Sequence, residues 1–162
     1  MSKSDDLLLE LNRGVAVYLK RIPPFKYQNK EYRLIDNYIA TPIMRCDICG
    51  DYLQWEISII ENCDGHTIRV GNACIDRLTG QNVSEWMKNF RQKRVNILAN
   101  RSCINQLSII LDAQNRKESS LEIPKAYVKE FRAILNQLCK GLNLTTKQRQ
   151  LTDSYLTLQI RA

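Results

Sequence analysis

The sequence predicts an α+β protein, with a helix first, a small β-region next and further helices at the end. Three observations lead to this fold class. Apolar residues recur at the spacing of one helix face in residues 5–20 and again in 84–113. The segment between them, 25–70, is rich in aromatic and β-branched residues and is interrupted by turn-forming pairs. Because the two element types are segregated along the chain, we expect no regular alternation of strands and helices.

The first predicted helix covers residues 5–20. Ser4 suits its N-cap, and two aspartates in its first turn suit the positive end of the helix dipole. Pro23-Pro24 ends the segment because a proline ring has no backbone N–H to donate. Residues 25–45 follow as one or two strands, broken by Gln28-Asn29 and Thr41-Pro42.

A β-hairpin is predicted next. Residues 55–62 and 67–70 are both β-prone, and Asp64-Gly65 lies between them. An Asp-Gly pair in this setting is typical of a type I′ turn, in which both central residues need a positive φ. Such a turn would put Cys63 opposite His66.

The rest of the chain shows helical spacing. Gly80 suits the end of a short helix over 72–80, and the polar residues 114–120 connect two longer helical regions. Thr145 and Gln148 have the spacing of a capping box for the last helix. The longer helices are predicted over 84–113, with a break at 100–102, and from 124 to 139.

These elements divide the chain into an N-terminal helix (1–24), a β-hairpin module (25–82) and a helical region (83–162), which can form one compact domain with 1–82. No apolar run approaches the roughly 18 residues that cross a bilayer, so no membrane partner is expected. The N-terminus has no basic stretch before its apolar residues and no small-residue cleavage site, so we expect no signal peptide. We therefore predict a cytoplasmic protein with reduced thiols.

Cysteine spacing predicts a metal site in the β-hairpin module. Cys46 and Cys49 form a C-x-x-C pair in CDICG, and Cys74 follows in VGNACI. A C-x-x-C turn brings two sulfur atoms to one side of a tight loop, and a cysteine in the first turn of a helix supplies a third ligand. We interpret the three thiols as ligands of a structural zinc ion. The alternatives are buried thiols that pair by chance and a thioredoxin-like redox pair, although no βαβ pattern surrounds them.

The spacing leaves the fourth zinc ligand open. A second helical ligand often follows the first by three residues, but that position is Arg77, which cannot ligate. His66 is the preferred candidate and Cys63 is the alternative, while an exposed turn histidine is a competing interpretation of His66. Asp76, a water molecule and distant Cys103 are further alternatives.

The segment CDICG and the later stretch WEISIIENCDGHTIRVGNACIDRL together resemble a group of small zinc-binding proteins of phage and mobile elements. The shared pattern is C-x-x-C-G, a β-hairpin, and Val-Gly-x-x-Cys at the start of a helix, as in a treble-clef zinc finger. The match spans residues 44–80, and the tail ILNQLCKGLNLTTKQRQLTDSYL is similar to the helical tail of some of these proteins. The resemblance implies a zinc site and a nucleic-acid setting, without a defined activity.

The net charge favours an anionic partner. The chain has 24 Lys and Arg residues against 17 acidic ones, which gives a net charge of +7 and a pI near 9.2. We predict phosphate contacts to DNA or RNA from one helix and from the cations beside the cysteines. Tyr52 and Trp55 would stack on a base or pack the hairpin, and packing is the preferred interpretation. The predicted phosphate-binding residues are Lys88, Arg91, Arg94, Arg101, Arg69 and Arg77.

No enzyme is expected from the motifs. The sequence lacks the H-x-E and P-C-x-x-C pair of zinc deaminases, H-E-x-x-H, a P-loop and G-x-G-x-x-G. The leading prediction is a non-enzymatic, zinc-stabilised nucleic-acid-binding protein. The alternative is a protein-interaction adaptor or inhibitor that docks a partner through the zinc module and the helical tail.

Overall fold

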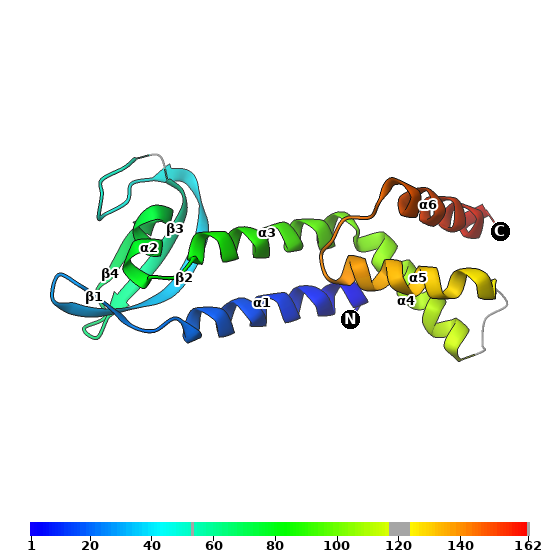
Figure 1. Cartoon of the computed structure of the whole chain (residues 1–162), viewed down its shortest axis with the longest axis horizontal. Coiled ribbons are helices and arrows are strands. Elements are labelled where there is room, and N and C mark those ends of the chain that lie inside the picture. Colours follow the sequence, from blue (N-terminus) through cyan, green and yellow to red (C-terminus); the bar gives the residue numbers. More distant parts are fainter. Residues whose placement is uncertain (53, 117–123, 162) are drawn as a thin grey trace. The chain divides into compact units, whose positions relative to one another are not determined.

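The computed structural model describes residues 1–52, 54–116 and 124–161, and these form two compact units (Figure 1). We call Asn12–Phe90 the sheet unit, and Met1–Leu11 together with Arg91–Ala162 the helical unit. Helices α1 (Lys3–Arg21) and α3 (Val83–Ala99) each contribute residues to both units.

The sheet unit is built on four antiparallel strands in the order β1-β2-β3-β4, followed by a short helix (Figure 1). Helix α1 precedes the sheet, and the remaining helices follow it. This arrangement confirms the predicted α+β class and its element order. The elements after α1 in this unit are β1 (Phe25–Tyr27), β2 (Lys30–Met44), β3 (Gln54–Asn62), β4 (Thr67–Gly71) and α2 (Asn72–Thr79).

The β3–β4 hairpin differs from the sequence prediction. Its loop has three residues, 63–65, because the backbone N–H of Asn62 bonds to the carbonyl of His66 at 3.0 Å. Of these residues only Gly65 has a positive φ, of 81°, which is the pattern of a three-residue loop rather than a type I′ turn. The side-chain oxygen of Asn62 accepts the N–H groups of Asp64 and His66, both at 3.0 Å. This side-chain cap stabilises the longer loop, so Asn62 and not Cys63 lies opposite His66.

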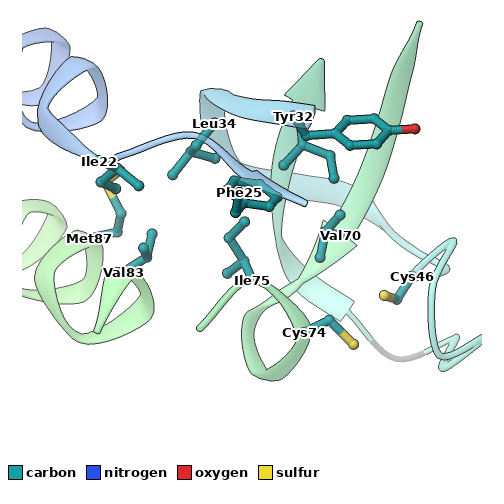
Figure 2. Close-up of a cluster of buried hydrophobic side chains, with 11 residues drawn as sticks. Ile22, Phe25, Tyr32, Leu34, Cys46, Val70, Cys74, Ile75, Val83 and Met87 are labelled. Carbon is teal, nitrogen blue, oxygen red and sulfur yellow. The ribbon is translucent and has the colours of Figure 1, made fainter. Parts of the chain in front are cut away.

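The core of the sheet unit forms between the sheet and its helices (Figure 2). Leu34, Ile60 and Val70 project from neighbouring strands onto Ile75 of α2. Aromatic stacking extends this core along α1 and α3. The Tyr18 and Trp86 rings lie 3.7 Å apart, and Phe90 stacks beyond Trp86.

The helical unit has its own apolar core. The capping box at Thr145 and Gln148 is confirmed, since each residue's side chain accepts the other's backbone N–H. The Ser4 cap is wrong: the hydroxyl of Ser2 accepts the N–H of Asp5, and Ser4 is buried inside the helix. The predicted connector 114–120 lies outside the described residues from position 117 onward. Besides parts of α1 and α3, the unit contains α4 (Arg101–Asn115), α5 (Lys125–Cys139) and α6 (Thr146–Arg161).

The apolar face predicted for the long helix over 84–113 packs into the cores of both the sheet unit and the helical unit. Trp86 and Phe90 belong to the sheet unit, whereas Ile97 and Ile104 belong to the helical unit. Asn100 interrupts the helix between α3 and α4, as the sequence predicted. Within the described residues, no helix has both the length and the apolar character needed to cross a membrane.

Candidate metal centre

A tight loop between β2 and β3 positions the first two cysteines. The backbone N–H of Cys46 bonds to the carbonyl of Asp51, and the N–H of Gly50 bonds back to the carbonyl of Cys46, both at 2.9 Å. Gly50 has a φ of +77°, which a residue without a Cβ adopts at little cost. These bonds bring Cys46 and Cys49 to one side of the loop.

Hydrogen bonds to an edge strand fix this loop beside the third cysteine. The N–H of Asp47 bonds to the carbonyl of Arg69 on β4, and the Asp47 carboxylate accepts the N–H of Arg69, both at 2.9 Å. Strand β4 ends at Gly71, where α2 begins, and Cys74 lies in the first turn of that helix. Cys74, five residues beyond Arg69, is therefore held close to the loop.

The structure brings Cys46, Cys49 and Cys74 together, with their three sulfur atoms within 4.8 Å of one another. Zinc–sulfur bonds of about 2.3 Å in tetrahedral geometry require sulfur separations of about 3.8 Å, so small side-chain movements suffice to bind a metal. Cys46 is fully buried and Cys74 is 3% exposed, whereas Cys49 faces solvent. In Figure 2 the Cys46 and Cys74 sulfur atoms approach from the loop and from the helix.

Backbone dipoles favour a thiolate at Cys46. Burial raises the pKa of this thiol, but the N–H groups of Cys49, Gly71 and Ile48 donate to its sulfur and together lower the pKa below its usual value. A sulfur atom that accepts several N–H donors carries its negative charge at reduced cost. The loop therefore makes this sulfur easier to ionise.

Cys74 behaves in the opposite way. Burial and the neighbouring thiol of Cys49 raise its pKa to about 11, against the lowering effect of Arg77. The Arg77 guanidinium donates to the Cys74 sulfur at 3.3 Å. Three adjacent thiolates repel one another, so ionising all of them needs a compensating positive charge, which a divalent metal supplies.

Neither of the preferred candidates for a fourth ligand joins the cysteine cluster. His66 and Cys63 are both exposed near the β3–β4 loop. Strand β4 separates them from Cys74, and at about 3.3 Å per residue its five residues extend roughly 16 Å. Within the described residues, no fourth His, Cys or carboxylate group comes into the same reach.

Asp76 and Cys103, two further candidates for the fourth ligand, contact other parts of the chain. The Asp76 carboxylate accepts the backbone N–H of Ser84 at 3.0 Å and also accepts its hydroxyl. Asp76 thereby links α2 to the start of α3. Cys103 packs against the core of the helical unit, where burial raises its pKa.

Comparisons with known proteins do not assign the chain to a family. No family model matches, and neither a curated protein nor a solved structure shows a significant match. The resemblance to phage-type zinc proteins therefore stays a prediction.

The predicted phosphate-binding cations have different surroundings. Lys88 and Arg94 are exposed on α3, but Arg91 on the same helix is half-buried. Arg101 forms an ion pair with Asp5 at 2.7 Å. Beside the cysteines, Arg69 and Arg77 are exposed, with Arg77 directed at the Cys74 sulfur.

Two features were missed by the sequence analysis. Tyr52 and Trp55 do not pack the hairpin, since they are 66% and 67% exposed, so that interpretation is wrong. The positive charge is also unevenly divided. The helical unit has 14 basic and 8 acidic residues, whereas the sheet unit has 10 and 9, so the units carry +6 and +1. The sequence does not show which segments belong to one unit, so only the division into units reveals this difference.

Proposed function

We propose that the protein binds nucleic acid through the helical unit, and that a structural zinc ion in the sheet unit holds Cys46, Cys49 and Cys74 together. Soft thiolate ligands select zinc over magnesium, calcium and manganese. Cys46 and Cys74 lie at the edge of an apolar core, which is the setting of a metal that supports folding. The exposed side of Cys49 leaves room for a water molecule or another group as the fourth ligand.

The observation that carries the nucleic-acid proposal is a cluster of cations from two acid-free segments. No acidic residue occurs between Glu85 and Asp112 or between Glu130 and Asp153. These segments contain α3 beyond its first turn, the last turns of α5 and the start of α6. We define the basic surface as the exposed residues Lys93, Arg94, Lys140, Lys147 and Arg149.

Contacts inside the helical unit bring these segments together. A Cβ placed on Gly141 would lie 2.7 Å from the Cβ of Lys93, so the end of α5 is pressed against α3. The Asn96 side chain donates to the carbonyl of Gly141 at 2.8 Å, and Arg149 donates to the side chain of Asn100 at 3.0 Å. Lysines of α3, of α6 and of the residue after α5 therefore gather on segments that contain no carboxylate. Such a cluster of positive charge favours a phosphate backbone.

The test compares two sets of three lysines with equal effects on net charge. Lys93→Gln, Lys140→Gln and Lys147→Gln together reduce the basic surface. The control variant carries Lys20→Gln, Lys26→Gln and Lys30→Gln, which are exposed lysines of the sheet unit. Each variant lowers the net charge from +7 to +4. Binding of labelled DNA and RNA, single-stranded and duplex, is measured over a range of salt concentrations.

We expect the basic-surface variant to lose affinity and the control to retain it. The log–log salt slope for duplex DNA should fall by about 0.9 for each phosphate contact removed, so by up to about 3. Equal losses in the two variants would contradict the assignment of binding to this surface. Failure of the wild-type protein to bind any of these nucleic acids at low salt would refute the proposed function.

A second candidate function, the adaptor, is favoured by exposed apolar side chains in the helical unit. Val95 and Leu98 on α3, Ile109 on α4, Tyr127 on α5 and Leu142 after α5 are all at least 43% exposed. Apolar docking of a protein would depend little on ionic strength, whereas phosphate binding weakens steeply with salt. The salt titration therefore separates the two functions.

A further inference from the structure

The segment that follows the metal-binding loop carries two large aromatic side chains that face solvent. Tyr52 and Trp55 are 66% and 67% exposed, and within the described part of the chain neither makes a ring–ring contact. The other tryptophan, Trp86, stacks between Tyr18 and Phe90. Burial of an aromatic ring is strongly favourable, so two exposed rings three residues apart leave binding surface available to a partner.

Arg45 contacts the Tyr52 side chain. Its guanidinium is 5.1 Å from the centre of the Tyr52 ring, and its Nη1 donates to the Tyr52 hydroxyl at 3.3 Å. Met44 pairs with Gln54 across β2 and β3. Arg45 follows Met44 and Trp55 follows Gln54, so both residues lie next to the same cross-strand pair.

We propose that Tyr52, Trp55 and Arg45 bind the unstacked bases of a single-stranded nucleic acid. This inference rests on the proposed function and adds to it the strand form of the ligand and the residues that contact its bases. Single-strand binders combine aromatic rings, on which bases stack, with arginines that contribute cation–π contacts and phosphate attraction. In a duplex the base faces are covered by neighbouring bases, so these rings would find no stacking partner there.

The local charge supports stacking rather than phosphate attraction as the main contribution of this loop. Asp47 and Asp51 lie in the same loop as Arg45, and the sheet unit as a whole carries only +1. A nearly neutral surface gains little from phosphates, so its affinity must come from the ring faces. Trp, Tyr and Arg are also common in protein interfaces, but the +7 charge of the whole chain selects an anionic polymer over a neutral protein surface.

The experiment uses the full-length, zinc-loaded protein and three fluorescent probes. The probes are a short DNA single strand, the same strand with abasic sites in place of its bases, and its duplex. Tyr52→Ala, Trp55→Ala and the double variant are compared with Tyr127→Ala, which removes an exposed tyrosine from α5 in the helical unit. Zinc content and thermal melting show that each variant is folded, and Trp55→Phe tests whether another aromatic ring restores binding.

We expect each alanine variant at Tyr52 or Trp55 to weaken single-strand binding by roughly 5- to 140-fold, the range for loss of one stacked base. Binding of the duplex and of the abasic strand should be unchanged, Trp55→Phe should retain most of the affinity, and Tyr127→Ala should have no effect. Unchanged single-strand binding, or equal losses for single strand and duplex, would overturn the inference while the proposed function stands. Absence of wild-type binding to every probe would instead mean that the proposed function itself has failed.

Discussion

Removal of the proposed zinc ion should unfold the sheet unit and leave the helical unit folded. Structural zinc contributes about 10–16 kcal/mol of binding free energy in small modules, which equals or exceeds the roughly 5–15 kcal/mol that stabilises a whole domain. Cys46 and Cys74 belong to the apolar core of the sheet unit, so loss of the proposed ion should separate the loop from α2. The core of the helical unit contains neither residue.

Two optical signals distinguish the units. Within the described residues, six helices have 19, 8, 17, 15, 15 and 16 residues, 90 in all, and 64 of these lie in the helical unit. Far-UV circular dichroism should therefore retain at least about seven-tenths of its helical signal after chelation. Both tryptophans of the chain, Trp55 and Trp86, lie in the sheet unit, and Trp86 is stacked between Tyr18 and Phe90. The fluorescence of Trp86 should therefore change when this unit unfolds.

The assay titrates the protein with a zinc chelator and records both signals together with released zinc. Cys74→Ser should reproduce the chelated state without chelator, whereas Cys63→Ser, the same change at an exposed cysteine outside the cluster, should behave as wild type. Coincident loss of fluorescence and of helical signal would show that the two units fold as one. Unchanged fluorescence after complete zinc release would show that the metal does not support the sheet unit.

Three further predictions concern stability and pH. Gly141→Ala should lower the free energy of unfolding in urea by about 2–5 kcal/mol, because a positive φ of 71° is disfavoured by about 1–2 kcal/mol and the added Cβ would lie 2.7 Å from Lys93. Gly80→Ala should lower it by only about 1–2 kcal/mol, since Gly80 has a φ of 63° and a Cβ there would have nothing within 4 Å. Equal losses in the two variants would contradict the packing at Gly141. Gly14→Ala, in the interior of α1 with nothing within 4 Å, should raise the unfolding free energy by about 1 kcal/mol, and a loss would indicate an unexpected contact. Zinc affinity should fall by at least about tenfold for each pH unit lost below the Cys74 pKa of about 11, because binding releases that proton. Competition titrations at several pH values measure this slope, and a fall of less than tenfold per pH unit would contradict the prediction.

Much of the fold follows from local patterns in the sequence. Helical spacing and caps predicted α2, the interruption at Asn100 and the Thr145–Gln148 capping box, because each depends on residues within a few positions of one another. The hairpin loop was mispredicted because the side chain of Asn62 competes with the turn preference of Asp64-Gly65. Such a side-chain cap is local, but an Asp-Gly pair alone does not reveal it.

Features that depend on distant residues could not be predicted. Periodicity placed Trp86 and Ile97 on one helix face, but it does not tell which core each one enters. Arg101 was assigned to phosphate, while its ion pair with Asp5 joins positions 96 residues apart. The cysteine cluster could be predicted only in part. The C-x-x-C spacing and the start of α2 indicated three ligands, whereas the Asp47–Arg69 hydrogen bonds that bring them together are visible only in the fold.

The different charges of the two units make their contributions to binding separable. Phosphate contacts release counterions, so they determine how steeply affinity depends on salt, and the +6 of the helical unit should dominate this slope. Stacking on Tyr52 and Trp55 releases few counterions, so removing both rings should lower single-strand affinity by the same factor at every salt concentration. On a log–log plot the double variant should run parallel to wild type, whereas the basic-surface variant should have a shallower line. If the aromatic variants change the slope and the lysine variants do not, then the phosphate contacts lie in the sheet unit and the division of roles argued from the charges is wrong.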